Sequence, residues 1–287
     1  MTDLRQPRGT AFTIRDPLPW DDVAAIAREG EGLGYEAVFL PEIGARDTLA
    51  TLAGLAGETS RLLLGTGVIP MRSRTPDLAA MAAATVQERS GGRHVLGVGT
   101  GGAAAGALDR LRTYVGAIRE RLDGSPLHLP APVPIWVAAL GPKATRLAGE
   151  LADGVILNWC TPDRVAEARG AIRDAAAAAG RDPDAVTIAV YVRASFSDRV
   201  DEALLAAASE YVSYPAYARQ FRAMGVDPTP EAVVETVCLR GDPVAARERL
   251  RAFRDAGADL PVVYPVLAPG EGGDASLPTL TALAPEV

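Results

Sequence analysis

Short apolar runs alternate along the chain with longer amphipathic segments that are rich in alanine. Runs such as VFL, LLLGTGV and GVIL are apolar at consecutive positions, which is typical of parallel strands that are buried on both faces. The pattern predicts eight strands, and these are Thr10–Ile14, Tyr35–Pro41, Leu62–Ile69, His94–Gly99, Ile135–Leu140, Gly154–Asn158, Thr187–Ala194 and Leu260–Val266.

An amphipathic segment follows each predicted strand except the last, and each segment predicts a helix. The predicted helices are Trp20–Leu33, Thr48–Glu58, Asp77–Arg89, Ala103–Leu122, Lys143–Ala152, Asp163–Ala179, Val200–Ser209 and Pro243–Ala256, with two extra helices at Ala216–Met224 and Glu231–Val237. Strict alternation implies a parallel sheet. Eight units in 287 residues fit a closed (β/α)8 TIM barrel better than an open sheet. We therefore expect one α/β domain over residues 1–287, with an irregular tail after about residue 267 apart from a final turn.

Composition narrows the class of protein. The chain is 48% apolar. Its formal net charge is −7, and this negative charge disfavours binding to the phosphate backbone of a nucleic acid. The N-terminus MTDLRQPRGT is polar, and no apolar run reaches the ~18 residues that span a bilayer. Cys160 and Cys238 are isolated, which argues against a disulfide framework or a zinc site and favours a reducing cytoplasm. No nucleic acid, membrane or metal partner is expected.

In a barrel of this kind, the working face lies at the carboxyl ends of the strands. That rule directs attention to six segments, which are Pro41–Ile43, Thr66–Pro70, Gly99–Gly102, Ala139–Gly141, Asn158–Cys160 and Arg193–Ser195. Tyr191 and Arg193 alternate along the seventh strand, so that Arg193 either meets a substrate or pairs with an acid. The aromatic stretch Tyr211–Met224 either covers the pocket or packs in the core or a dimer contact.

One segment predicts an anion site. The sequence PIWVAALGPKATRLAGELADGVILNW, over 134–159, has the pattern strand, turn, helix, turn, strand. The helix begins at Pro142-Lys143, where proline costs no hydrogen bond and the free N–H groups favour a phosphate. Lys143 is the only lysine of the chain. It either helps to bind that phosphate or is a solvated residue of the first turn.

Other motifs have competing interpretations. The run over 97–102 matches the GxGxxG motif of dinucleotide-binding folds, but it lies in the fourth strand–helix unit and leaves the three earlier units unexplained. We therefore expect its glycines to leave space for a flat ligand at the barrel mouth. Glu42 either orients a ligand or exchanges a proton, or else it pairs with Arg46. His94 and His128 are expected to be structural. Cys160 is expected to be a buried filler, and Ser195 has no histidine partner in sight.

Four blocks in order carry a resemblance to a known family. They are LGYEAVFLPE (33–42), SRLLLGTGVIPMRSRTPDLAA (60–80), SGGRHVLGVGTG (90–101) and PIWVAALGPKATRLAGELADGVILNW (134–159). Together they resemble the luciferase-like monooxygenase superfamily, and more closely its deazaflavin branch, the coenzyme F420-dependent oxidoreductases. The similarity extends over nearly the whole chain, from LGYEAVFLPE to DLPVVYP.

The resemblance implies a barrel that holds an isoalloxazine-like ring at its mouth, with a non-proline cis peptide behind the ring at Gly67-Val68. It implies a phosphate site at Ala138, Ala139, Leu140, Gly141 and Pro142, with Lys143 nearby. Glu42 resembles a strand-end position close to the ring. Thr66, Gly99, Thr100 and Asn158 are expected to line the site as well.

Two acid–base positions of relatives are absent. Some relatives carry a histidine at the second strand end, where this chain has Glu42-Ile43-Gly44, and some carry a glutamate where it has Gly101-Gly102-Ala103. Glu42 is therefore the one candidate for catalysis, and the proton donor stays open.

The predicted function is hydride transfer between coenzyme F420 and a small organic substrate by a homodimer. The alternatives are a flavin mononucleotide (FMN) monooxygenase, a non-catalytic deazaflavin- or flavin-binding protein, and a nicotinamide dehydrogenase.

Overall fold

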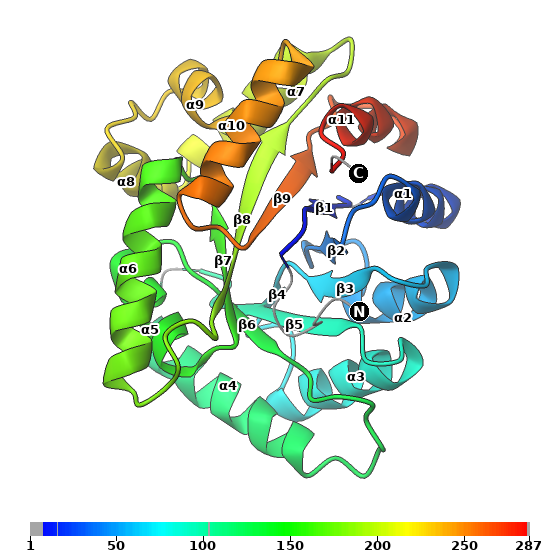
Figure 1. Cartoon of the computed structure of the whole chain (residues 1–287), viewed down its shortest axis with the longest axis vertical. Coiled ribbons are helices and arrows are strands. Elements are labelled where there is room, and N and C mark those ends of the chain that lie inside the picture. The colour runs from blue at the N-terminus through cyan, green and yellow to red at the C-terminus, as the bar shows by residue number, and fades with distance from the viewer. Residues whose placement is uncertain (1–7, 16, 103, 286–287) are drawn as a thin grey trace.

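Parallel strands form the centre of the molecule in a computed structural model that describes residues 8–15, 17–102 and 104–285. Helices surround these strands in a ring (Figure 1). The strands are β1 (Ala11–Thr13), β2 (Ala37–Leu40), β3 (Leu63–Thr66), β4 (Ile69–Pro70), β5 (His94–Gly99), β6 (Ile135–Ala138), β7 (Gly154–Asn158), β8 (Thr187–Ala194) and β9 (Leu260–Pro265). All eight predicted strands are confirmed, and the third is present as two pieces, β3 and β4.

The sheet closes on itself. Its order is β3-β2-β1-β9-β8-β7-β6-β5-β4, and a further parallel pairing of β3 with β5 joins the two ends. Each pairing between these strands is parallel, as the alternation of strands and helices predicts. The predicted (β/α)8 barrel is therefore confirmed.

The helices agree with the prediction to within a few residues. They are α1 (Trp20–Gly32), α2 (Thr48–Glu58), α3 (Pro76–Arg89), α4 (Ala107–Asp123), α5 (Pro142–Leu151), α6 (Pro162–Ala178), α7 (Val200–Val212), α8 (Pro215–Ala223), α9 (Pro230–Val237), α10 (Pro243–Asp255) and α11 (Leu277–Ala282), with a 3₁₀ turn η1 (Gly273–Ser276). The helix predicted from Ala103 begins only at Ala107, because Gly106 precedes it with a φ of 68°. Ala103 itself lies outside the described residues.

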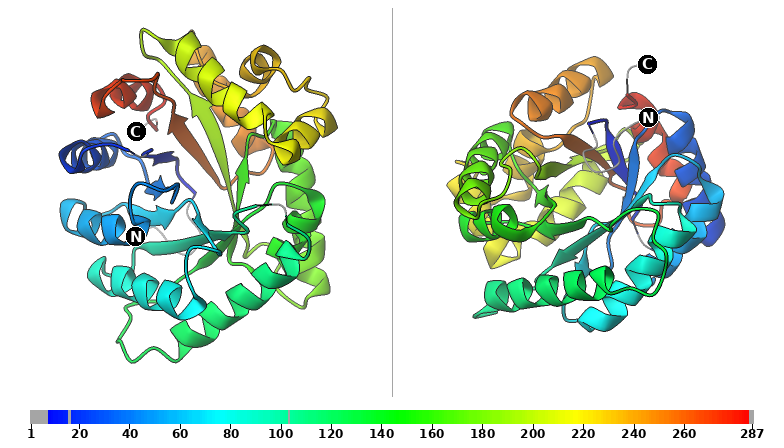
Figure 2. Two further views of the ribbon diagram at one scale, coloured as in Figure 1. Left: turned by 180° about the vertical axis from the view of Figure 1, so that it is seen from behind. Right: turned by 60° about the horizontal axis from the view of Figure 1, so that its bottom comes forward.

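The tail after residue 267 is more regular than predicted, because its apolar residues have a surface to cover. Leu280 and Leu283 are buried, and the carbonyl of Leu280 accepts a hydrogen bond of 2.8 Å from the Tyr35 hydroxyl. The turn η1 lies against α1, where the Gly273 N–H donates to Asp22. This end of the chain therefore closes the barrel wall beside α1 (Figure 2).

The third strand is interrupted at a cis peptide bond between Gly67 and Val68, as the family resemblance predicted. The Thr66 hydroxyl bridges β3 to β5 just before the interruption. It donates to the Gly97 carbonyl and accepts from the Gly97 N–H, both at 2.7 Å. A Cβ atom on Gly97 would overlap the Thr66 carbonyl, and one on Gly65 would overlap the Phe39 ring. The absence of a side chain at these two glycines therefore lets the Thr66 carbonyl and the Phe39 ring pack against the backbone.

Large side chains fill the inside of the barrel. The Phe39 ring lies 5.7 Å from that of Trp136 and 6.2 Å from that of Tyr191, so residues from β2, β6 and β8 meet at the centre. These residues belong to one apolar cluster, and a second cluster joins the outer face of the strands to the helices. A ligand must therefore bind at the rim, above the packed interior.

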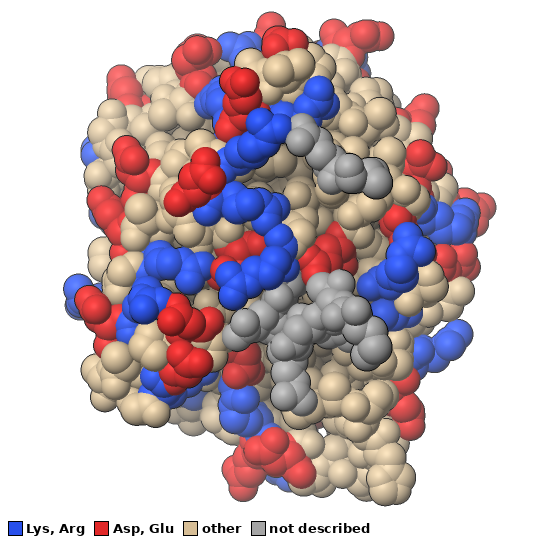
Figure 3. All heavy atoms as spheres, in the orientation of Figure 1, with Lys and Arg blue, Asp and Glu red and all other residues tan. Residues whose placement is uncertain are grey.

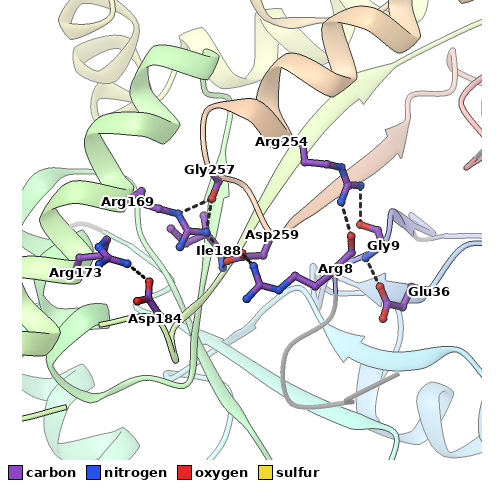
Figure 4. Close-up of polar contacts among 10 residues, drawn as sticks. All are labelled: Arg8, Gly9, Glu36, Arg169, Arg173, Asp184, Ile188, Arg254, Gly257 and Asp259. Carbon is purple, nitrogen blue, oxygen red and sulfur yellow. Dashed lines mark hydrogen bonds and ion pairs between the residues drawn. The ribbon is translucent and has the colours of Figure 1, made fainter. Parts of the chain in front are cut away.

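Polar contacts close the end of the barrel at which the strands begin (Figure 4). The buried carboxylate of Asp259 pairs with Arg8 at 2.7 Å and with Arg169 at 2.6 Å, and it accepts the Ile188 N–H at 2.9 Å. Arg254 donates to the carbonyls of Arg8 and Gly9.

Basic and acidic side chains are interspersed across the face in Figure 3.

Among the described residues, no helix is both long enough and apolar enough to cross a membrane.

His94 gives stability a dependence on pH. The ring is fully buried, and Nδ1 lies 2.7 Å from the Leu64 carbonyl, which can only accept. Burial disfavours the charged imidazolium and lowers the pKa of His94 from 6.5 to about 4. The unfolded chain therefore takes up a proton that the folded chain does not, and stability falls as the pH drops from about 6.5 toward 4.

We expect wild-type protein to lose up to ~3 kcal/mol of unfolding free energy to this group over that window. Urea titrations across the window should give a flatter pH dependence for His94→Asn. The exposed His128 is the matched control, and His128→Gln should follow the wild-type curve. Equal slopes for His94→Asn and the wild type would contradict this account.

Candidate active site at the barrel mouth

Three neighbouring strand ends form a low apolar surface at the mouth of the barrel, which we call the floor. It consists of Val68, Gly99 and Ala138. An ideal Cβ on Gly99 would lie 2.9 Å from Val68 Cγ2 and 3.4 Å from Ala138 Cβ, so these residues are adjacent. Val68 and Ala138 are half-buried, and Gly99 is buried against Val68. The floor therefore presents only apolar side chains to the mouth, which suits a flat apolar ring.

The cis peptide lies at one edge of the floor. The Tyr191 hydroxyl crosses the barrel from β8 and donates to the Gly67 carbonyl at 3.3 Å. A Cβ on Gly67 would overlap that hydroxyl. The structure thus brings together Gly67, Val68, Gly99 and Ala138, which the sequence assigned to one site.

Two predicted lining residues have other positions. Thr66 is 0% exposed, and its hydroxyl is occupied by the Gly97 backbone, so it supports the barrel wall beneath the floor. Ala139 is also buried. Both side chains point into the packed wall, and the role of these two residues in cofactor binding stays a prediction. Thr100 and Leu140 remain half-buried at the rim.

The first turn of α5 faces open space beside the floor. No side chain caps this helix, whereas Thr161 caps the neighbouring α6 by accepting from the Arg164 N–H. A Cβ on Gly141 would meet no atom within 4 Å, and Pro142 and Lys143 are exposed. The arrangement can bind an anion through N–H groups at the positive end of the helix dipole.

Glu42 is held in an ion pair, but its partner is not the predicted Arg46. The Arg74 guanidinium lies 2.8 Å from Glu42 Oε2, and the Ser73 hydroxyl donates to Oε1 at 2.9 Å. Both charged side chains are largely buried, at 11% and 9% exposure. Arg74 also pairs with Asp47 at 2.8 Å, and these bonds raise the pKa of Arg74 above its ordinary value, the one with Glu42 most.

Asn158 lies at the opposite side of the mouth, where its amide is already engaged. Its Nδ2 donates to the Tyr217 hydroxyl at 2.8 Å, and its Oδ1 accepts from Arg193. The next residue, Trp159, has a φ of 53°, and Gln220 of α8 donates to its carbonyl at 2.7 Å. Asn158 therefore connects the end of β7 to the segment that covers it.

Cys160 behaves as expected. Burial raises the pKa of the Cys160 thiol to about 12, which keeps it protonated near neutral pH and suits a buried filler. Within the described residues, no group of three or more His, Cys, Asp or Glu could hold a metal ion.

Sequence reasoning missed Arg74, Tyr114 and Gln220. Arg74 directly precedes Thr75, which caps α3, and that position after a strand end could have marked it. Tyr114 is buried near Glu42 and Arg74 without a partner for its hydroxyl among the described residues, and burial raises its pKa to about 12. Nothing local to Gln220 indicates its contact with β7.

Residues 5–260 match the family described as luciferase-like monooxygenase, and the chain belongs to that family. The resemblance seen in the sequence is confirmed.

Relatives and a solved structure extend this result. The 5,10-methylenetetrahydromethanopterin reductase of Methanolobus tindarius is 30% identical over 263 residues, which cover 82% of this chain and 79% of the relative. The F420-dependent glucose-6-phosphate dehydrogenase of Nakamurella multipartita is 30% identical over 223 residues, 64% of this chain and 66% of the relative. The structure of coenzyme F420 dependent tetrahydromethanopterin reductase from Methanopyrus kandleri aligns with a TM-score of 0.75 at 20% identity, covering 97% and 98% of the two chains.

The ion pair of Glu42 predicts a loss of stability when its charge is removed. Glu42→Gln should lower the unfolding free energy by ~1–3 kcal/mol, because Arg74 then keeps a buried charge with a weaker partner. Chemical denaturation measures the change. The control is Asp47→Asn, which removes the half-exposed partner of Arg74 and should cost at most ~1 kcal/mol. A Glu42→Gln variant as stable as the wild type would contradict the structural importance of this pair.

Proposed function

We propose that this protein is a coenzyme F420-dependent oxidoreductase that transfers a hydride between the deazaflavin and a small organic substrate. The observation that carries the proposal is the apolar floor of Val68, Gly99 and Ala138 beside the Gly67-Val68 cis peptide, with the open first turn of α5 next to it. Membership of the luciferase-like family and the F420-dependent relative support the same activity.

The residues present fit a flat ring with a charged tail. The floor of Val68, Gly99 and Ala138 would hold the ring, and Gly67 with Thr100 would line its edge. The first turn of α5, with Gly141, Pro142 and Lys143, would hold the phosphate. When bound, the deazaflavin supplies a carbon, C5, that accepts or donates the hydride.

The chain's own residues would orient the two reactants and exclude water. Trp159, Tyr211 and Tyr217 lie together beyond the floor, where the Trp159 and Tyr211 ring centres are 4.9 Å apart and those of Tyr211 and Tyr217 are 4.7 Å apart. These aromatic side chains would form the wall of the substrate pocket. Glu42 stays our candidate for a direct contribution to the reaction, beside Val68 at the rim, where its N–H donates to the Val68 carbonyl.

Binding of coenzyme F420 and of FMN to the purified protein tests the cofactor assignment. We expect the deazaflavin to bind more tightly, and Gly141→Trp to weaken it at least ~30-fold because the indole would occupy the space in front of α5. Gly32→Trp is the matched control, since a Cβ there also meets no atom within 4 Å and Gly32 lies at the end of α1. Tighter FMN binding with oxygen consumption would favour a monooxygenase.

Turnover separates an enzyme from a carrier. We expect the absorbance of reduced F420 to change toward that of the oxidised form when a suitable carbonyl or imine acceptor is added with wild-type protein. The bound deazaflavin would supply the hydride, the pocket residues would hold the acceptor carbon beside it, and a proton from solvent or protein would complete the product. Tight binding without oxidation across a broad panel of acceptors would indicate a carrier.

We also propose that the protein is a homodimer in the cytoplasm. Leu78 and Met81 lie on α3 with 48% and 66% of their surface exposed, an unusual position for large apolar side chains. Both cysteines are buried and free, which suits a reducing compartment. Sedimentation should give twice the chain mass, and Met81→Glu should shift it toward the monomer. The exposed Val244 on α10 is the control, because Val244→Glu should leave the dimer intact.

A further inference from the structure

A buried arginine with no acidic partner in the described part of the chain lies at the mouth of the barrel. Arg193 is near the end of β8 and is only 3% exposed. Its guanidinium carbon lies 4.2 Å from the centre of the Tyr264 ring, 4.6 Å from that of Trp159 and 5.2 Å from that of Tyr211. Aromatic faces thus surround the charge, and they compensate part of its desolvation.

The guanidinium has few hydrogen-bond acceptors. It donates to Asn158 Oδ1 and, at 3.4 Å, to the Tyr211 hydroxyl. In residues 8–15, 17–102 and 104–285, no aspartate or glutamate forms an ion pair with it. Glu210, the acid beside Tyr211 in sequence, lies 3.5 Å from Arg15 instead.

Arg93 shows what a structural buried arginine requires in this protein. It is 8% exposed, and its guanidinium donates to the carbonyls of Ser90, Leu62, Ala56 and Thr59 and to the Thr59 hydroxyl. Arg93 is therefore saturated by backbone acceptors. Arg193 donates to no backbone carbonyl among the described residues, so the two arginines have different environments.

The donor geometry of the Arg193 guanidinium indicates which kind of acceptor would bind it. A guanidinium has five N–H donors in one plane, and aromatic faces cannot satisfy donors in that plane. Its fork matches the two oxygens of a carboxylate better than any neutral acceptor does. A buried cation that keeps donors unmatched is costly unless a ligand supplies the acceptor.

The position of Arg193 separates it from the phosphate site. Strand β8 stands opposite β3 and β4 in the barrel, because Tyr191, two residues before Arg193, reaches the Gly67 carbonyl across the interior. Arg193 lies one layer nearer the mouth and is buried, whereas Lys143 is exposed at the start of α5, which follows β6, two strands away from β8. An anion at Arg193 is therefore a different group from an anion at Lys143.

We propose that Arg193 binds a carboxylate of the substrate, with its planar fork aimed at the carboxylate oxygens and Tyr211 and Tyr217 covering the pair. The proposal deepens the proposed function, since it assigns the substrate class of the same pocket, namely small carboxylic acids. Tyr217 is tied to Asn158, and the neighbouring Tyr211 contacts Arg193, so the segment that joins α7 to α8 closes over this position. Entry of the acid would require this segment to move.

Benzoate and benzamide form a matched pair of probes that differ in charge but not in shape. Calorimetry with the wild-type protein should show benzoate binding at least ~10-fold tighter than benzamide, with a change in Trp fluorescence because Trp159 stacks on the guanidinium. Arg193→Gln should reduce the preference to within ~3-fold, and Arg193→Lys should keep part of it, because lysine retains the charge without the fork.

Controls identify the site and the fold. Arg219→Gln removes an exposed arginine from α8 and should leave benzoate binding unchanged. Inorganic phosphate should not displace benzoate, and Gly141→Trp should still bind it. Circular dichroism checks that each variant is folded, and the comparison of the two probes on wild-type protein needs no variant.

Equal affinity of the wild type for benzoate and benzamide would overturn the proposal, and so would a folded Arg193→Gln variant that keeps the preference. Loss of benzoate binding in a folded Gly141→Trp variant, together with displacement of benzoate by phosphate in the wild type, would also overturn it, because the anion would then bind at α5. Benzoate binding does not require F420. A protein that prefers benzoate but fails to bind the deazaflavin would refute the proposed function and leave the assignment of Arg193 intact.

Discussion

Closure of the parallel sheet is the constraint on which the other features of this protein depend. The barrel closes where β3 and β5 pair over Leu64–His94 and Gly65–Val95. Beyond these pairs the Thr66 hydroxyl takes the place of a backbone partner for Gly97. Closure brings Phe39, Trp136 and Tyr191 together and fills the interior, so that strand ends are left as the place where a ligand can lie. The cis peptide, the floor and the start of α5 follow one another around that rim.

The two ends of the barrel use charge differently. At the end where the strands begin, Asp259 compensates Arg8 and Arg169, and backbone carbonyls saturate Arg93, so the cations there are matched by the protein itself. At the mouth, the positive end of α5 and the guanidinium of Arg193 lack such matching partners. Two positive groups at separate positions around the mouth suit a pocket that takes up two anionic ligand groups.

Stability and binding share residues at the rim. Glu42 and Arg74 join the end of β2 to the segment before α3, and the Glu42 N–H donates to the Val68 carbonyl beside the cis peptide. Gln220 of α8 similarly donates to the carbonyls of Asn158 and Trp159, where the backbone has a positive φ at Trp159. These contacts place the edges of the floor relative to the cover segment, so a change in either will affect geometry as well as stability.

The sequence by itself determined the eight strand–helix units, their order and most boundaries, since apolar periodicity is a local property that neighbouring residues encode. Through four ordered blocks it also identified the family and the cis peptide. Only the tertiary structure decided that Glu42 pairs with Arg74 and not Arg46, that Thr66 and Ala139 point into the wall, and that residues 277–282 form a helix. It also decided that Arg193 has no acid partner among the described residues. Each of these features depends on contacts between residues that are distant in sequence. Such contacts set ion pairs and side-chain burial, and they exist only once the barrel has closed.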